Sequence, residues 1–404
     1  MLTVEEALAL VVQHTCPLAP QVCALARCLG LRLAETIVSD VDSPPYDKSL
    51  MDGYAVRSAD LATGSAELRV VDEVTAGDVP HRALMPGDAA RIMTGAPLPE
   101  GADAVVMIEE SELLGGDPPR VRLTCPGPVR PEQNILRTGV CMRRGEEVLS
   151  PGHLLRPGDV GLLAEVGRDR VQVYPRPHVA VLSTGNELVP AGTKPGPGQI
   201  RNSNGPMLLA MAASAGAETR DLGIARDDPE ELYRRISQGL ESDALVLSGG
   251  VSAGKMDLIP QTLERCGVQA IFHKVLLRPG KPLWFGVHPE RGTLVFGLPG
   301  NPVSSFVCFH LFVRLALLRL AGSEATAPPL RRARLAQAFQ QKGDRPTWHP
   351  AALSDDGETL TAQPVRWQGS ADLRALATAQ GLIYFPAGTR AYEAGEEVQV
   401  LPFA

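Results

Sequence analysis

The sequence ALVLSGGVSAGKMD, residues 244–257, predicts a buried strand, a glycine-rich loop and the start of a helix. Its first four residues are apolar, glycines stand at positions 249, 250 and 254, and Asp257 precedes a helical apolar pattern. Such a loop lets backbone N–H groups and the positive end of a helix dipole converge on an anion. The stretch therefore predicts an α/β domain whose loop binds a phosphate-bearing ligand. The predicted ligand-binding residues in the loop are Gly249, Gly250, Ser252 and Gly254.

The spacing Gly249-x4-Gly254-Lys255 is close to a Walker A loop. Met256, however, stands where a Ser or Thr hydroxyl would contact Mg²⁺ in a P-loop NTPase. We also find no obvious acidic partner strand of the Walker B type. A P-loop NTPase stays open as an alternative, but the loop favours another kind of phosphate site.

Apolar strand-like runs alternate with helical patterns through residues 175–325. This alternation is typical of right-handed βαβ units and a mainly parallel sheet. Ligands of such sheets bind at the carboxyl ends of the strands. The predicted strands are 179–182, 217–222, 245–247 and 293–296, and the predicted helices start near residues 204, 229, 257 and 302.

Two more loops follow predicted strands of this sheet. STGNEL, residues 183–188, follows the first strand, and GLPGNPVSS, residues 297–305, follows the last. Because parallel strands release their loops at one edge, we expect all three loops to surround one ligand. Asn301 and Pro302 also suit the start of a helix, so plain helix capping is an alternative for them. The candidate binding residues in these loops are Thr184, Gly185, Pro299, Asn301, Pro302 and Ser304.

Charged side chains are predicted near the same edge. Lys274, Arg278 and Lys281 lie around a Pro-Gly turn and could bind an anion, although a solvated surface loop would have the same composition. Carboxylates beside a phosphate site commonly hold Mg²⁺. Asp257 could equally be a helix N-cap, and so could Asp228. The candidate Mg²⁺ ligands are Glu187, Asp227 and Asp257.

The composition is that of an ordinary globular protein, with 44% hydrophobic and 21% charged residues. A net charge of −7 and an aromatic content of 4% argue against nucleic acid and membrane surfaces as partners. The seven cysteines contain no C-x-x-C pair, which fits a reducing compartment. The N-terminus has acidic residues and a Thr3–Glu6 capping box instead of a signal peptide. We therefore expect a cytoplasmic protein. Residues 304–320 are apolar but contain His310, Arg314 and Arg319, and we expect this stretch to be too polar and slightly too short to span a bilayer.

Four regions follow from the patterns along the chain. Residues 1–42 and 146–174 are expected to form a helical N-terminal and linker domain, with a β-rich domain of residues 43–145 inserted between them. Residues 175–325 form the α/β domain. Residues 326–404 follow a Pro-containing linker and predict a small β-barrel or sandwich.

Two Pro- and Gly-rich stretches in the inserted region complete a set of six ordered motifs. They are SPPYDKSLMDGYAVR, residues 43–57, and RIMTGAPLPEGADAVV, residues 91–106. From composition alone, Asp52 and Thr94 in them would be ordinary turn residues. Together with STGNEL, SGGVSAGKMD, LRPGKP and GLPGNPVSS, they make the chain resemble the MoeA family of molybdopterin molybdenumtransferases over nearly its whole length. The eukaryotic scaffold protein gephyrin carries a related domain.

The resemblance implies a four-part fold with a molybdopterin-binding α/β domain and a C-terminal β-barrel. It implies transfer of molybdenum from molybdate to adenylylated molybdopterin, with Mg²⁺-dependent release of AMP, in molybdenum cofactor biosynthesis. It also implies a homodimer, in which Asp52 and Thr94 complete the cleft of the partner subunit. Asp257, Glu187, Asp52 and Thr94 would then be catalytic, and Lys274, Arg278, Lys281, Arg345 and Ser370 would bind substrate. Many family members have Lys in place of Arg278, which keeps the charge but changes its geometry.

Other possibilities stay open from the sequence. A pterin-binding scaffold protein would keep the fold without turnover, although it would not need Asp52, Thr94, Glu187 and Asp257. Tungstate has nearly the size and charge of molybdate, so either metal fits. Transient contact with the molybdopterin adenylyltransferase and with other proteins of the cofactor pathway is a further expectation.

Overall fold

The computed structural model describes residues 1–250 and 258–403 and contains two compact units. The first unit consists of Met1–Ala34, Gly152–Arg156 and the chain from Arg170 onward. The second consists of Glu35–Pro151 and Pro157–Asp169. The chain thus leaves the first unit twice, after Ala34 and after Arg156, and returns to it each time.

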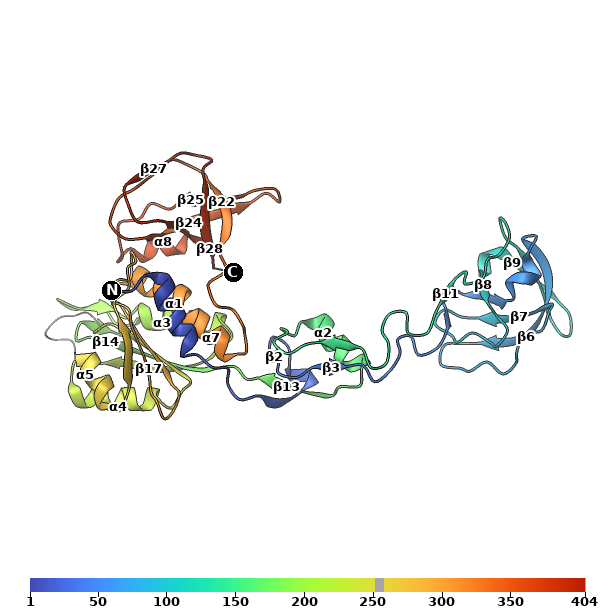
Figure 1. Ribbon diagram of the computed structural model, residues 1–404, viewed down its shortest axis with the longest axis horizontal. Helices are drawn as coiled ribbons and strands as arrows, with labels where there is room; N and C mark the ends of the chain where they lie inside the picture. Colours follow the sequence, from blue (N-terminus) through green and yellow to red (C-terminus); the bar gives the residue numbers. More distant parts are fainter. Residues whose placement is uncertain (251–257, 404) are drawn as a thin grey trace. The chain divides into compact units, whose positions relative to one another are not determined.

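A six-stranded sheet forms the centre of the first unit (Figure 1). The strands β17, β14, β18 and β21 are parallel neighbours, whereas β20 is antiparallel to β21 and β19 to β20. The mainly parallel sheet is therefore as predicted, but its antiparallel edge was not foreseen. In sheet order the strands are β17 (Glu218–Ala225), β14 (His178–Thr184), β18 (Ala244–Ser248), β21 (Leu294–Leu298), β20 (Trp284–Val287) and β19 (Gln269–His273).

Helices cover both faces of this sheet (Figure 1). Alternate residues of each central strand face opposite layers: Val179 and Val181 join one core, and Ala180 and Leu182 join the other. This explains why these strands read as continuous apolar runs. One layer holds α1 (Val4–Gln13), α3 (Asn204–Ser214), α6 (Pro302–Cys308) and α7 (Arg314–Leu320), and the other holds α4 (Pro229–Gly239) and α5 (Leu258–Arg265).

A long apolar helix runs from Pro302 to Leu320. A π-helical turn, Phe309–Val313, joins α6 to α7. With 19 residues, this helix is long and apolar enough to cross a membrane by length and composition, so the expectation that it is too short and polar was wrong. Its most apolar window is 78% buried inside the fold, however. The helix is accordingly a core helix of the α/β domain.

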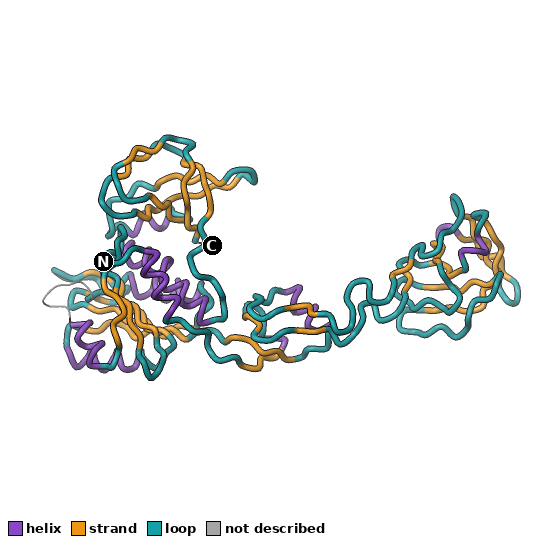
Figure 2. The backbone as a smooth tube through the Cα atoms, viewed as in Figure 1, coloured by secondary structure: helices purple, strands orange, loops and turns teal. Residues whose placement is uncertain are grey.

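The C-terminal region forms a closed β-barrel, as the sequence indicated (Figure 2). Its side chains Trp348, Leu382 and Leu401 belong to the same apolar core as α1 and α7. The barrel is therefore packed against the α/β domain. In barrel order its strands are β22 (Arg331–Leu335), β25 (Leu360–Pro364), β24 (Thr347–Asp355), β26 (Gly381–Phe385) and β28 (Glu397–Pro402), accompanied by the pair β23 (Phe339–Gln341) and β27 (Arg390–Tyr392) and by α8 (Leu373–Ala377).

The N-terminal region is less helical than predicted. The Thr3–Glu6 capping box is present, with hydrogen bonds of 3.1 Å and 2.8 Å, but α1 ends at Gln13. Pro17 and Pro20 then prevent helix continuation, because proline lacks the N–H that a helix needs. The following residues form β1 (Gln21–Ala24), the 3₁₀ turn Leu25–Arg27 and β2 (Arg32–Leu33), and both strands pair with β13 (Arg170–Tyr174).

Residues 146–167 also depart from the helical expectation. Their first part is the strand β12 (Glu147–Leu149), and only Pro157–Glu165 is helical, as α2. Because residues 1–42 and 146–174 were expected to form one helical domain, this segment would pack on the N-terminal helix. Instead, β12 pairs with β3 (Ile37–Val38), whereas α1 packs against α7 of the α/β domain.

The second unit is β-rich. The unit is built around a six-stranded sheet. In this sheet β6 and β7 are parallel, and the other neighbouring strands are antiparallel. Its strands in sheet order are β8 (Ala104–Met107), β5 (Gly53–Val56), β7 (Asp88–Ile92), β6 (Ser65–Val74), β10 (Arg120–Thr124) and β9 (Ser111–Gly115). The unit also holds the pair β4 (Lys48–Ser49) and β11 (Ile135–Leu136) and the 3₁₀ turns Ser58–Leu61 and Ile108–Glu110.

Candidate functional site

The three predicted loops meet at the carboxyl edge of the central sheet. Their strands, β14, β18 and β21, are parallel neighbours in register. The backbone N–H of Gly249 donates to the carbonyl oxygen of Leu298 over 3.1 Å, and Thr184 Oγ1 donates to the carbonyl oxygen of Ser248 over 3.4 Å. The convergence that the sequence predicted is therefore real for the described parts of the loops.

A cavity of about 260 Å³ lies where these loops meet. Five predicted site residues line it: Thr184, Glu187, Gly249, Asn301 and Pro302. The remaining lining comes from β15 (Leu188–Val189), the end of β18, the loop after β21, the C-terminal region and the segment that enters α3. These residues are Leu188, Ile200, Arg201, Asn202, Ser203, Asn204, Ser248, Gly300 and Ala371.

Two glycines in the loops are required by the backbone. Gly249 has φ +97°, and a Cβ there would lie 2.6 Å from the carbonyl oxygen of Thr184. Gly185 has φ +145°, and a Cβ there would lie 2.5 Å from a carboxylate oxygen of Glu187. Only glycine lets the loops approach this closely and lets the Glu187 side chain lie across position 185. Gly250 also has a positive φ, of +63°, and lies beside Thr184 Oγ1.

Asn301 takes the N-cap position of α6, but its side chain does not cap the helix. Its Nδ2 instead donates to Ser370 Oγ over 2.9 Å. The Val303 N–H donates to the carbonyl oxygen of Ser370 over 3.0 Å. The barrel residue Ser370, which the family resemblance assigned to the site, is therefore held beside the cavity. Pro299 and Ser304 are not among the lining residues of the cavity. The Pro299 carbonyl accepts a hydrogen bond from Ser305 Oγ, and Ser304 is buried.

The two acids named as metal ligands beside Asp257 differ in their surroundings. Glu187 lines the cavity, whereas Asp227 exchanges hydrogen bonds with Asn186, of 3.4 Å and 3.2 Å. Asp228 is the N-cap of α4, with bonds of 3.1 Å and 2.8 Å to backbone N–H groups, which confirms the capping alternative for it. Across residues 1–250 and 258–403, no group of three or more His, Cys, Asp or Glu side chains forms a metal cage.

The predicted cations are not among the lining residues of the cavity, and Arg278 and Arg345 lie at the junction of sheet and barrel. Arg278 exchanges backbone hydrogen bonds of 2.8 Å with Pro346 and Trp348, and its guanidinium donates to the carbonyl oxygen of Lys342 over 3.0 Å. The Arg345 guanidinium donates to the carbonyl oxygen of Leu277 over 3.2 Å. Lys274 has a left-handed backbone, with φ 75°, and its N–H donates to Leu283. Lys281 accepts a backbone bond from Val275.

Asp52 and Thr94 form a pair in the second unit. One carboxylate oxygen of Asp52 accepts from the Thr94 backbone N–H over 2.6 Å and from Thr94 Oγ1 over 2.7 Å. These two hydrogen bonds lower the pKa of Asp52 below its usual value. The two residues that the resemblance selected from separate motifs are thus in direct contact. Three other predicted site residues, Ser252, Gly254 and Asp257, lie outside the described residues.

Sequence reasoning missed the contribution of Asn204 and Ser248. Ser248 was predicted to follow the strand 245–247, and Asn204 was predicted to start a helix. Both are buried in the cavity wall, and Asn204 Nδ2 donates to Ser248 Oγ over 2.8 Å. The clustered polar residues Asn202, Ser203 and Asn204 before an apolar helix were the available signal.

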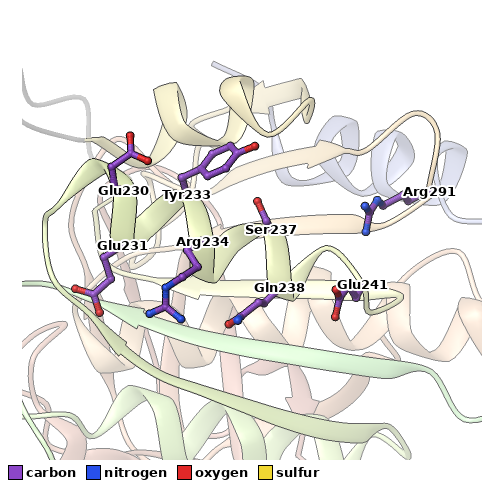
Figure 3. A pocket seen from close by; sticks show the side chains of 8 residues that line it. All are labelled: Glu230, Glu231, Tyr233, Arg234, Ser237, Gln238, Glu241 and Arg291. Carbon is purple, nitrogen blue, oxygen red and sulfur yellow. The ribbon is translucent and has the colours of Figure 1, made fainter.

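A larger groove of about 690 Å³ runs along the exposed side of α4 (Figure 3). Arg291, at one end of the groove, precedes β21, so that end lies at the opposite edge of the sheet from the three loops. At the other end, Glu230 is already paired with Arg265 over 2.7 Å. Because ligands of parallel sheets bind at the carboxyl edge, the smaller cavity is the candidate site. The groove is lined by Glu230, Glu231, Tyr233, Arg234, Ser237, Gln238, Glu241 and Arg291.

Three family models match consecutive parts of the chain. The MoeA N-terminal region (domain I and II) matches residues 2–167. A "Probable molybdopterin binding domain" matches residues 180–319, which include the cavity. The MoeA C-terminal region (domain IV) matches residues 332–403.

Curated and solved relatives cover the same length. The molybdopterin molybdenumtransferase of Bacillus subtilis (strain 168) is 36% identical over 94% of this chain and 88% of its own length. That of Staphylococcus aureus (strain Mu50) is 33% identical over 98% and 94%. A crystal structure of a molybdopterin biosynthesis MoeA protein from Pyrococcus horikoshii is 34% identical, has a TM-score of 0.84 and covers 100% of this chain and 99% of its own. A second from the same organism is 28% identical, with a TM-score of 0.83 and 99% coverage of both chains.

Proposed function

The chain belongs to the MoeA family of molybdopterin molybdenumtransferases, and we propose that it moves molybdenum from molybdate onto adenylylated molybdopterin and releases AMP. It is a transferase of molybdenum cofactor biosynthesis. Molybdopterin and molybdenum are its substrates. The mechanism, the use of Mg²⁺ and the shared active cleft belong to the proposal.

The observation that carries the proposal is the cavity at the carboxyl edge of the parallel sheet. It lies inside the part of the chain that matches the molybdopterin-binding model, and three separate loops build it. Glycine at position 249 lets the backbone of one loop come close to the Thr184 carbonyl of another, which brings their polar groups together at the cavity. These features suit a substrate that carries phosphate groups.

The proposed reaction is hydrolysis of the phosphoanhydride that joins AMP to the molybdopterin phosphate. Water attacks one phosphorus, the bridging P–O bond breaks, and AMP and the molybdopterin phosphate separate. Molybdate binds the two dithiolene sulfurs, and the oxygens that they displace leave as water with protons from the thiols and the solvent, without a change in oxidation state. In this reaction the protein mainly positions the substrate and stabilises developing negative charge. Glu187, at the cavity, and the loop glycines would hold the reacting group in place.

The donor chemistry of the site suits Mg²⁺, because Glu187 lines the cavity and offers the carboxylate oxygens that this ion prefers, and Asp227 is the second described carboxylate of the proposed ligand set. Mg²⁺ commonly takes only one or two carboxylates and completes its shell with phosphates and water, so a full protein cage is not needed. When bound, the ion would neutralise charge on the phosphoanhydride.

Asp52 and Thr94 are the residues of the second unit that take part in the proposed reaction. We propose a homodimer in which this pair reaches the cleft of the other subunit. The hydrogen bonds from Thr94 keep Asp52 ionised, which suits a role in orienting a cation or a water. A cytoplasmic location and transient contact with the molybdopterin adenylyltransferase, which would supply the substrate, are part of the same proposal.

The test is to incubate the purified chain with adenylylated molybdopterin, molybdate and Mg²⁺. We expect AMP and molybdenum-loaded cofactor in equal amounts, and we expect neither when molybdate or Mg²⁺ is left out. Binding of the substrate without AMP release would instead support the non-catalytic scaffold. A parallel assay with tungstate would show which oxyanion is used.

A further inference from the structure

Asn204, which no family assignment above includes, carries an unpaired acceptor at the cavity. It is the first residue of α3 and lines the cavity, and only 8% of the residue is exposed to solvent. Its Oδ1 is buried and has no hydrogen-bond partner among residues 1–250 and 258–403. A buried acceptor without a hydrogen-bond partner is unfavourable. A ligand that donates a hydrogen bond to this oxygen would remove that cost.

The orientation of the Asn204 amide follows from its neighbours. Nδ2 lies 2.7 Å from the carbonyl oxygen of Gly300 and 2.8 Å from Ser248 Oγ. A carbonyl oxygen can only accept a hydrogen bond, so the amide nitrogen must face Gly300. Turning the amide over would place two acceptors against each other. Oδ1 is therefore the atom left without a partner.

The neighbouring Asn202 does not have an unpaired side-chain oxygen. Its Oδ1 already accepts from Ser183 Oγ and from the Gly205 N–H, both over 3.0 Å. This leaves Asn204 Oδ1 as the unsatisfied buried side-chain acceptor of the described cavity wall.

The kind of ligand group follows from this acceptor. Phosphate and molybdate oxygens are poor partners, because an oxyanion repels another acceptor. The group must present an N–H or O–H donor. Leu188 of β15 (Leu188–Val189) and Ile200 of β16 (Ile200–Arg201) are partners in neighbouring parallel strands, and both line the cavity. Ile200 is 57% exposed. The apolar side chains of Leu188 and Ile200 beside the unpaired Asn204 acceptor fit a flat heterocycle that bears an amino group.

We propose that this cavity binds the amino-bearing ring of the substrate, whose N–H donates to Asn204 Oδ1. The inference rests on the proposed function, because adenylylated molybdopterin carries two such rings, a purine and a pterin. Both present an exocyclic amino group next to a ring nitrogen. The Asn204 acceptor thus distinguishes the ring end of the substrate from its phosphates and would set its direction in the site.

The test uses equilibrium binding to the full chain, measured by calorimetry. The purine probes are AMP and purine riboside 5′-monophosphate, which lacks the 6-amino group, and the pterin probe is dihydroneopterin monophosphate. The variants are Asn204→Ala and, as a matched control, Thr293→Val. Asn204→Ala removes two hydrogen bonds within the protein, and the control removes one buried hydrogen bond, of 3.0 Å to the Leu240 carbonyl, at the amino end of β21.

We expect Asn204→Ala to lower the affinity for one of the amino-bearing probes about 10-fold. Thr293→Val should leave that affinity unchanged. If the purine occupies the cavity, wild-type protein will prefer AMP over the deaminated nucleotide by a similar factor, and Asn204→Ala will lose that preference. If the pterin occupies it, only the pterin probe will respond to the substitution. Since the purine comparison alters the ligand, it holds even where the Ala variant folds poorly.

Equal binding of every probe to wild type and Asn204→Ala would overturn the inference. The AMP-release assay separates this result from failure of the proposed function. Turnover with no role for Asn204 would reject the inference alone. Asn204-dependent ring binding without turnover would reject the transferase mechanism alone.

Discussion

Asn301 Nδ2 lies 2.9 Å from Ser370 Oγ, so the loop after β21 is hydrogen-bonded to the C-terminal barrel. The two residues are 69 positions apart in the sequence. The barrel therefore takes part in forming the cavity, since Ala371 next to Ser370 also lines it. Changes in the barrel should consequently affect the candidate site.

Replacing Ser370 by Ala should lower kcat/KM for AMP release about 5- to 10-fold, because one hydrogen bond of about 1 kcal/mol that positions Asn301 is lost. Global unfolding should change little, since Ser370 is only partly buried. Ser354→Ala on the exposed part of β24 is the matched control. Unchanged kinetics in Ser370→Ala would show that the barrel does not tune the site.

Glu187→Gln should raise the Mg²⁺ concentration needed for half-maximal AMP release by at least about 10-fold. The substitution keeps the size of the side chain but removes the charge that would hold the ion. Glu241→Gln, which removes an exposed carboxylate paired with Arg220 over 3.3 Å, serves as the control. An unaltered Mg²⁺ dependence in Glu187→Gln would remove Glu187 from the proposed ligand set.

Gly249→Ala and Gly300→Ala should differ sharply in stability. At position 249 the positive φ alone should cost about 1–3 kcal/mol, and the new Cβ would also meet the Thr184 carbonyl oxygen. At position 300 the nearest atom to a new Cβ is 3.8 Å away, so the fold should tolerate it. Chemical unfolding of both variants is the measurement, and equal stability would contradict the close approach of the loops.

Thr94→Val should raise the pKa of Asp52 toward its ordinary value of about 3.9. The Thr94 backbone N–H, the larger cause of the lowered pKa, stays in place, so the return should be partial. Because the folded-state pKa is lowered, these hydrogen bonds stabilise the fold above the ordinary pKa, and their contribution is lost as pH falls through the folded value. Carboxyl ¹³C NMR would report the shift. Thr138→Val, which instead removes a bond to Asp47, should leave Asp52 unchanged.

His310, in the π-helical turn, should make the fold acid-sensitive. Burial, and secondarily the charge of Arg314, lower its pKa to about 4. Between that value and about 6.5 the unfolded chain binds the proton more readily, so stability should fall by about 3 kcal/mol as pH drops through this range. His310→Leu should flatten this dependence in urea unfolding followed by tryptophan fluorescence. The same slope in both proteins would assign the acid sensitivity to other groups.

The sequence predicted those parts of the fold that local signals determine. Asp228 with Pro229 marked the start of α4, and the apolar run 244–247 marked β18. The N-terminal region was predicted too helical because the apolar spacing continued past Pro17, where strand pairing with β13 takes over. Pairing with a segment about 150 residues away leaves no local pattern in β1.

The candidate site was predictable only where its residues lie in glycine loops. Thr184, Glu187 and Gly249 were found because each follows a recognisable strand. Asn204 was missed because its role depends on Gly300, which is 96 residues further along the chain. Arg278 and Arg345 carry the right charge, but their contacts with Lys342 and Leu277 place them at the junction with the barrel.

The most direct test of the central claim is a crystal structure of this chain with AMP, the product of the proposed reaction. We predict that AMP binds at the carboxyl edge of the sheet, in contact with the cavity that Thr184, Glu187 and Gly249 line. AMP bound instead in the groove along α4, with that cavity closed to ligand, would contradict the account.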